Sequence, residues 1–251
     1  MNKDYFSSDF TLGILGGGQL GKMLLYETRK WDIKTHVLDP SPEAPCKIAC
    51  DYFQQGDLTD YQSVYEFGKK ADVITIEIEA VNIQALYDLQ ADGKKVHPQP
   101  EVLEIIQNKI SQKRFYEKRH LPTADFFSYK SKEELRLAIE KEDIELPMVW
   151  KAATGGYDGR GVQILKDKAD TKDLPDTACL IEDKINFTHE LSVIVARNAS
   201  GESASYPVVE MEFHPTANQV EYVITPARVT STVHQNAKQL AQQVANEMGI
   251  V

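Results

Sequence analysis

Hydrophobic and polar residues alternate in blocks along the first hundred positions, and these blocks predict strands separated by helices. An apolar run at 10–15 meets a glycine-rich turn, and a helical pattern then continues through Trp31. Two further apolar runs, at 35–38 and 72–78, are separated by a helical segment at 61–69. Strands that alternate with helices in this way predict a parallel sheet with helices on both faces.

Chemically distinctive residues follow each of these predicted strands. The glycine turn at 16–21, Asp39, and the pair Glu77 and Glu79 all fall at strand ends, where a parallel sheet binds its ligands. The G-x-G-x-x-G spacing of the turn fits a dinucleotide site, with Asp39 in the place of a ribose-binding acid. The same geometry binds any phosphate at a helix N-terminus, or is a turn without a ligand. We favour a phosphate ligand other than a dinucleotide.

The pattern changes after His97-Pro98-Gln99-Pro100, which we expect to separate two domains. Helices are predicted at 111–119, 132–142 and 234–248, the last ending at Gly249. Strands with long connections are predicted for the rest of this half. They lie at 125–129, 148–151, 162–165, 178–182, 190–197, 205–212 and 221–224.

The segment 154–161 holds four glycines in eight residues, directly after an apolar run that ends at Lys151. Glycine backbone allows several N–H groups to turn onto anionic oxygens, while Lys151 and Arg160 add positive charge at either end. This combination favours a mobile lid over phosphates, with an ordinary hairpin loop as the alternative. Lys109 would be a second lysine for a nucleoside triphosphate, or else a solvated surface residue.

The end of the strand at 178–182 offers a nucleoside pocket. Glu182-Asp183-Lys184-Ile185 closes this strand, and Glu190 begins the next. Carboxylates accept hydrogen bonds from ribose hydroxyls, and backbone amides can both donate to and accept from a purine edge. Ordinary surface charges are the alternative. His214 is the weakest candidate, because a loop histidine needs no chemical role.

Composition narrows the class of protein. With 42% hydrophobic and 26% charged residues, the chain of 251 residues suits a soluble enzyme, and it has no apolar run near the roughly 20 residues that span a bilayer. The N-terminus has no apolar signal core, so we expect a cytoplasmic protein without a membrane partner. A net charge of −10 argues against nucleic acid as a partner. Cys46, Cys50 and Cys179 lack zinc-ligand spacing and are expected to be reduced thiols.

Several motifs, in this order, resemble the ATP-grasp superfamily, and within it the 5-(carboxyamino)imidazole ribonucleotide synthase family. The likeness covers nearly the whole chain. Its motifs lie at 17–24, 75–79, 112–113, 120–123, 154–161 and 185–187, with Glu190. The resemblance implies an α/β protein of ATP-grasp architecture. We expect a doubly wound parallel-sheet domain at 1–108, a small α+β lid domain at 109–184, and an incomplete antiparallel-sheet ATP-grasp domain at 185–251.

The reaction that the resemblance implies is an ATP-dependent carboxylation in de novo purine biosynthesis. ATP phosphorylates bicarbonate to carboxyphosphate, and the exocyclic amine of 5-aminoimidazole ribonucleotide takes the carboxyl group. ATP and Mg²⁺ are the implied cofactors, and a homodimer is expected. The alternatives are another ATP-grasp carboxylase or formyl-phosphate enzyme, an NAD-binding oxidoreductase, and a nucleotide-binding module without catalysis.

The resemblance also implies roles for individual residues. Those expected to bind ATP are Lys109, Lys151, Gly156, Tyr157, Asp158, Gly159, Arg160, Gly161, Val162, Glu182, Asp183, Lys184, Ile185, Glu190 and His214. Those expected to bind the aminoimidazole ribonucleotide are Gly18, Gln19 and Leu20, with Glu77 or Glu79. Tyr157, Asp158 and Arg160 are expected to be catalytic. The family's Mg²⁺-binding acids would lie beyond Val251, so we expect no metal ligand in this chain and little or no synthase activity.

Overall fold

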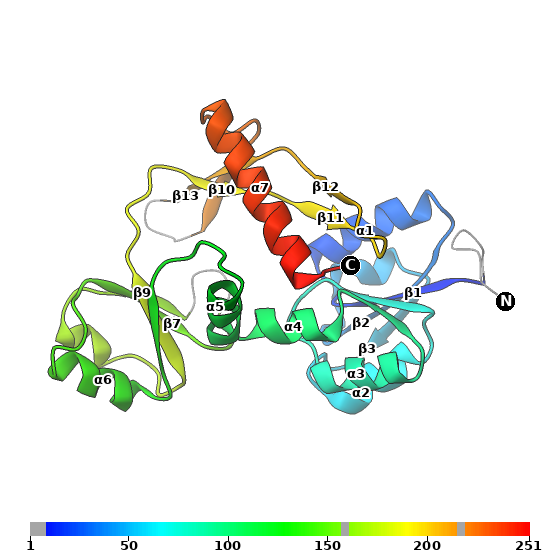
Figure 1. Ribbon diagram of the computed structural model, residues 1–251. Coiled ribbons are helices and arrows are strands. Elements are labelled where there is room, and N and C mark those ends of the chain that lie inside the picture. The colour runs from blue at the N-terminus through cyan, green and yellow to red at the C-terminus, as the bar shows by residue number, and fades with distance from the viewer. Residues whose placement is uncertain (1–8, 157–160, 215–218) are drawn as a thin grey trace. The chain divides into compact units, whose positions relative to one another are not determined.

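The computed structural model describes residues 9–156, 161–214 and 219–251, and it divides into two compact units (Figure 1). Unit 1 is Met1–Glu104 and unit 2 is Ile105–Val251. The chain passes from one to the other within helix α4, Pro100–Gln107. In the described part of the chain, no helix is both long and apolar enough to cross a bilayer.

Unit 1 is built on a five-stranded sheet in the order β3-β2-β1-β4-β5, with every pairing parallel. The strands are β1 Thr11–Leu15, β2 Lys34–Asp39, β3 Tyr52–Gln55, β4 Val73–Ile76 and β5 Lys95–His97. The connecting helices are α1 Gln19–Arg29, the short 3₁₀ turn η1 Pro45–Ile48, α2 Tyr61–Gly68 and α3 Ile83–Ala91. The order of the strands reverses at β1 and β4, so the loops that follow these two strands open at one topological switch point.

Helices cover both faces of this sheet because successive strand residues point to opposite sides. Ile14 of β1 is buried in a cluster with Leu25 of α1. The residue that precedes it in β1, Gly13, lies against Phe67 of α2 on the opposite face. Figure 1 shows α1 on one side of the sheet, with α2 and α3 on the other. The predicted doubly wound arrangement is therefore confirmed.

The first part of unit 2 is a four-stranded antiparallel sheet in the order β6-β9-β7-β8. Its elements are α5 Lys109–Lys118, β6 Phe126–Tyr129, α6 Lys132–Glu140, β7 Met148–Ala152, β8 Val162–Leu165, η2 Lys168–Thr171 and β9 Cys179–Asp183. Trp150 and Ile181 are paired across β7 and β9, and they bury one face of this sheet against Leu135 and Ile139 of α6. The other face is left for α5, which contacts β9.

The second part of unit 2 has two small antiparallel sheets and a long helix. The elements are β10 Glu190–Ser192, β11 Val195–Arg197, β12 Ser203–Ser205, β13 Val209–Phe213, β14 Val220–Ile224 and α7 Ser231–Met248. One sheet has the order β10-β13-β14, and the other pairs β11 with β12. Helix α7 contacts β11 and β12. It ends at Gly249, whose φ of 64° is the left-handed conformation expected of a C-terminal cap.

Two predicted strands, at 190–197 and 205–212, were wrong as continuous elements. Each run changes partner part-way, because β10 pairs with β13 whereas β11 pairs with β12. Pro207 also lies between β12 and β13, and proline cannot donate to a strand ladder. Six further elements were not predicted from the sequence pattern, namely β3, α3, β5, α4 and the two 3₁₀ turns η1 and η2. The three cysteines are free thiols, as predicted.

Candidate functional site

The glycine turn after β1 is held between two carboxylates in unit 1. The Gly17 N–H donates to Asp39 Oδ2 at 2.7 Å, so Asp39 fixes the turn from the end of β2. Glu77 follows β4, and its N–H donates to the carbonyl of the last β1 residue at 2.7 Å. A Cβ placed on Gly18 would lie 2.6 Å from Glu77 Oε1, and one on Gly16 would lie 2.7 Å from Oε2. The Glu77 carboxylate therefore rests on the glycine backbone.

Gly18, Gln19 and Leu20 begin helix α1 beside this carboxylate. Gly18 is the N-cap, and among the described residues no side chain caps the helix there. The first N–H groups of such a helix favour an anion, because they lack partners within the helix. Gln19 and Leu20 are exposed.

Glu77 and Glu79 differ in their surroundings. Alternate residues of a continuous strand point to the same face, but β4 ends at Ile76 and a bend follows, so no strand holds Glu77 and Glu79 on one face. Glu77 is half-buried against the glycine turn, whereas Glu79 is exposed. The contact with the turn makes Glu77 the better candidate of the two.

Three charged side chains from three elements meet in unit 2: Lys113 of α5, Lys151 of β7 and Glu182 of β9. Lys151 pairs with Glu182 Oε1, and Lys113 Nζ lies 2.9 Å from Glu182 Oε2. The Glu182 side chain is 13% exposed, so this carboxylate is largely removed from water. Burial alone would raise its pKa, but the hydrogen bonds and charges of the two lysines outweigh that effect. The pKa of Glu182 therefore lies below its usual value, and the carboxylate is ionised at neutral pH.

Lys109 joins α5 to the start of the glycine-rich segment. Its N–H donates to the carbonyl of Ala153 at 2.8 Å, and its Nζ donates to the carbonyl of Gly155 at 2.9 Å. Gly155, Gly156 and Gly161 all have positive φ, between 69° and 80°, a conformation that glycine adopts without strain. The predicted residues Tyr157, Asp158, Gly159 and Arg160 lie outside the described residues. Val162 begins β8.

Glu190 lies within the electrostatic reach of Lys151. Burial raises the pKa of Glu190, and the charge of Lys151 partly opposes this rise. Lys151 thus acts on both Glu182 and Glu190, and the structure brings three predicted residues together. Asp183, Lys184 and Ile185 follow at the end of β9, where they line a cavity of about 530 Å³ with Met148 of β7 and four further residues.

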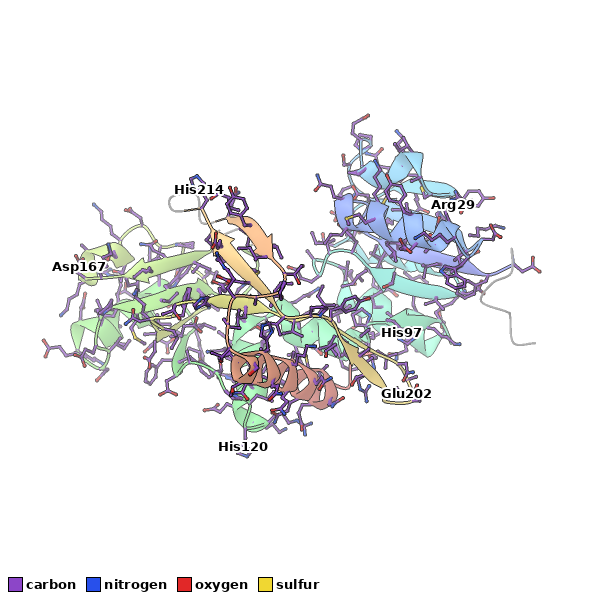
Figure 2. The ribbon with its side chains drawn as sticks, turned by 90° about the horizontal axis from the view of Figure 1, so that it is seen from above. Arg29, His97, His120, Asp167, Glu202 and His214 are labelled. Carbon is purple, nitrogen blue, oxygen red and sulfur yellow. The ribbon has the colours of Figure 1, made fainter. Side chains whose placement is uncertain are left out.

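His214 is exposed and follows β13 (Figure 2). Its N–H donates to the carbonyl of Gln219 at 2.8 Å, which closes the connection to β14. A cavity of about 600 Å³ lies near this strand and includes Glu190, Glu210 and Arg228, but His214 is not among the described residues that line it. A nucleotide role for His214 stays a prediction.

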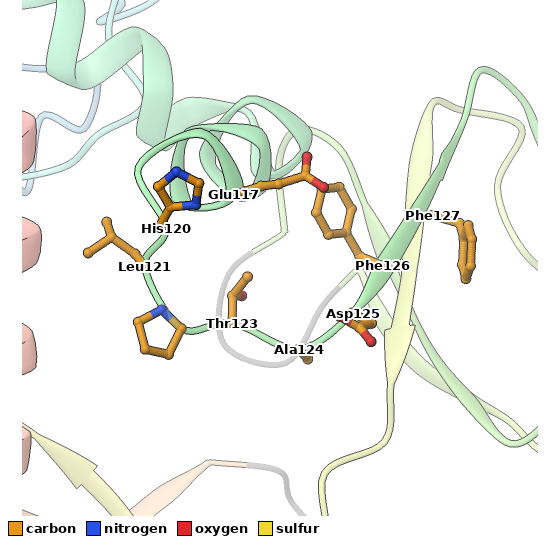
Figure 3. A pocket seen from close by; sticks show the side chains of 9 residues that line it. Glu117, His120, Leu121, Thr123, Ala124, Asp125, Phe126 and Phe127 are labelled. Carbon is orange, nitrogen blue, oxygen red and sulfur yellow. The ribbon is translucent and has the colours of Figure 1, made fainter.

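A further cavity of about 510 Å³ lies where α5 ends and β6 begins (Figure 3). It is lined by Glu117, His120, Leu121, Pro122, Thr123, Ala124, Asp125, Phe126 and Phe127. Among the described residues, none that is predicted to bind ATP or the ribonucleotide lines this cavity.

Lys113 is the functional candidate to which sequence reasoning gave no role. It was noted only as part of a motif, yet it supplies half of the positive charge around Glu182. A signal was present in the sequence, since Lys109 and Lys113 are four residues apart on one helix and so lie on the same face.

A metal site requires ligands that converge. Among the residues that the structure describes, no group of three or more His, Cys, Asp or Glu side chains could hold a metal ion. Magnesium bound to nucleotide phosphates usually takes only one or two protein carboxylates. A Mg²⁺ ion at the nucleotide phosphates would thus need no cluster of three such side chains from the protein.

Comparison with protein families divides the chain much as the structure does. Residues 114–251 match the ATP-grasp domain model, over more than half of the chain. The chain belongs to the ATP-grasp family. Residues 10–107 of this ATP-grasp protein match the ribonucleotide synthetase preATP-grasp domain model, which corresponds to the doubly wound unit 1.

Individual relatives of this ATP-grasp chain agree with one another. It is 32% identical to the N5-carboxyaminoimidazole ribonucleotide synthase of Bacillus subtilis over 255 residues, which cover all of this chain and 66% of that protein. The structure resembles the synthetase of Thermotoga maritima with a TM-score of 0.83 and 34% identity, over 96% of this chain and 62% of that one. It also resembles the Aspergillus clavatus synthase in complex with ADP and 5-aminoimidazole ribonucleotide, with a TM-score of 0.83 and 29% identity. This match covers 95% of this chain and 62% of that one. The chain thus spans slightly less than two thirds of these relatives.

Proposed function

We propose that this chain carries the nucleotide-binding and ribonucleotide-binding residues of an ATP-dependent carboxylase. Its substrates would be bicarbonate and 5-aminoimidazole ribonucleotide, and its products the carboxyamino ribonucleotide, ADP and phosphate. One observation supports this most strongly. Lys151 is held at a buried carboxylate beside the glycine-rich segment, in a chain whose relatives are N5-carboxyaminoimidazole ribonucleotide synthases.

ATP would bind in unit 2. Lys109 and Lys151 would contact its phosphates, and the segment from Gly156 to Val162 would close over them. The backbone from Glu182 to Ile185 would hold adenine, with Glu190 on the ribose. Phosphoryl transfer needs mainly positioning and neutralisation of charge, which lysines and backbone N–H groups supply.

The ribonucleotide would bind in unit 1, at the turn formed by Gly18, Gln19 and Leu20. Its phosphate suits the start of α1, where no described side chain caps the helix. The carboxylate of Glu77 can accept hydrogen bonds from hydroxyl or amine groups.

The reaction would begin when a bicarbonate oxygen attacks the γ-phosphorus of ATP, which releases ADP and forms carboxyphosphate. The exocyclic amine then attacks the carboxyl carbon, the bond to phosphate breaks, and the amine loses a proton. Tyr157, Asp158 and Arg160 would act where the two substrates meet. A closed lid would exclude water from the acyl phosphate, which hydrolyses readily.

When bound with the nucleotide, Mg²⁺ would neutralise part of the negative charge of the phosphates. We also propose that the protein is a cytoplasmic homodimer.

The experiment that tests this function is a thermal melt of the chain with Mg-ADP and, separately, with NAD. A ligand present at about 100 times its Kd stabilises the native state by about 2.7 kcal/mol, which raises the Tm by several degrees. We expect ADP to raise the Tm and NAD to leave it unchanged. A rise with NAD alone would contradict the proposal and make the turn at 16–21 a dinucleotide site. A separate melt tests whether 5-aminoimidazole ribonucleotide, the proposed acceptor of the carboxyl group, raises the Tm of the same chain.

A further inference from the structure

Lys113 is a buried lysine of unit 2. Its Nζ donates to Thr123 Oγ1 at 2.7 Å and to the carbonyl of Ala124 at 2.8 Å, and it lies 2.9 Å from Glu182 Oε2. The ring centroid of Phe126 is 5.2 Å away. In Figure 3, Thr123, Ala124 and Phe126 follow one another along the loop into β6. An ammonium group has three protons, and here all three have acceptors. Lys113 therefore has no donor left for a ligand.

Lys151 differs from Lys113 in its access to solvent. Its side chain is 30% exposed, whereas that of Lys113 is 9% exposed. Each carboxylate oxygen of Glu182 pairs with a different lysine. Two lysines and one carboxylate together carry one net positive charge. Because Lys113 is the buried member, this surplus charge faces outward through Lys151.

We propose that Lys113 is a positioning residue that neutralises Glu182 and thereby leaves the charge of Lys151 available to the phosphates of a nucleotide. This inference rests on the proposed function, which puts Lys151 at the phosphates. Without Lys113, the carboxylate and Lys151 would form a closed pair with no net charge. A lysine in such a pair must give up part of its attraction to Glu182 before it can bind a phosphate.

The test compares two ligands that differ only in their phosphates. Isothermal titration gives the affinities of ADP and adenosine for the unaltered chain and for Lys113→Met. We expect the preference for ADP over adenosine to fall about tenfold in the variant, the order expected of one unit charge inside a protein. The affinity for adenosine should stay the same. Lys118→Met removes an exposed lysine from the same helix and should keep the full preference.

A second variant separates charge from packing. Lys113→Met combined with Glu182→Gln removes one charge of each sign, so Lys151 again carries the only net charge of the cluster. We expect this double variant to regain the preference for ADP. If Lys113→Met does not fold, Lys113→Gln replaces it, since its amide can still donate to Thr123 or Ala124 without a charge.

Two results would overturn the inference alone. One is an unchanged preference for ADP in a folded Lys113 variant, and the other is an equal loss of affinity for ADP and adenosine, as a merely structural role would cause. A different result would overturn the proposed function and this inference with it, namely an unaltered chain that binds no ADP.

Discussion

Two carboxylates at strand ends, Glu77 and Glu182, show how the surroundings of a residue decide its chemistry. Glu182 is buried between two lysines, and their charges keep its pKa low. Glu77 instead lies against glycine backbone at the start of a helix. Glu182 is suited to hold cations in place, whereas Glu77 is suited to accept hydrogen bonds from a ligand.

The contact between Gly18 and Glu77 gives a prediction at this scale. Gly18 has a φ of −71°, which alanine adopts readily, but a Cβ there would lie 2.6 Å from Glu77 Oε1. Gly18→Ala should therefore displace the carboxylate. We expect it to weaken binding of 5-aminoimidazole ribonucleotide about tenfold, the effect of losing one hydrogen bond to a charged group. Titration calorimetry measures this, with ADP affinity as the internal control. Unchanged binding of the ribonucleotide would exclude Glu77 from its site.

At the scale of elements, an arginine ties β13 to the segment that follows β14. Arg228 donates to Glu210 from its backbone N–H at 3.0 Å, from Nε at 3.0 Å and from Nη2 at 2.7 Å. It also pairs with Glu212, two residues further along the same face of β13. These hydrogen bonds lower the pKa of Glu210 from 4.5 to about 2.

Acid titration tests this link. Because the pKa of Glu210 is lower in the folded state, its contribution to stability is fully present above pH 4.5 and is lost as the pH falls toward 2. Arg228→Met should therefore lower the Tm at neutral pH. The difference in Tm between this variant and the unaltered chain should shrink steadily below pH 4.5. Arg136→Met, which removes an arginine with exposed partners, should change the Tm little at any pH. A pH-independent difference for Arg228→Met would contradict the argument.

At the scale of the whole molecule, the two proposed sites belong to different units. The ribonucleotide turn lies in unit 1, and the nucleotide residues from Lys109 onward lie in unit 2. No sheet is shared between the described parts of the two units, and each unit has its own buried core. We therefore expect each ligand to act mainly on the unit that binds it.

Hydrogen exchange measured by mass spectrometry on the full chain tests this division. ADP should slow exchange in peptides from β7, β9 and the start of α5. The ribonucleotide should slow exchange in peptides that contain the turn at 16–21 and the loop after β4. Protection of the unit 1 turn by ADP alone would contradict the assignment of the two ligands.

Much of the fold could be predicted from the sequence, and the failures have physical causes. Strands with strong apolar runs, such as β1, β7 and β9, were predicted within a residue or two because their pattern is local. The run at 190–197 was wrong because its two halves pair with different strands. Short elements such as β5, with three residues, are too brief to show a period.

The sequence alone determined what depends on neighbouring residues: the alternation of strands and helices, the glycine turn and the glycine-rich segment. The tertiary structure decided which charged groups meet. Lys113, Lys151 and Glu182 are 31 or more positions apart, and the packing of α5 against β9 and the pairing of β9 with β7 unite them. It also decided that Asp39 holds the glycine turn while Glu77 rests on it. Contacts of this kind follow from sheet order and register, which a local pattern does not contain.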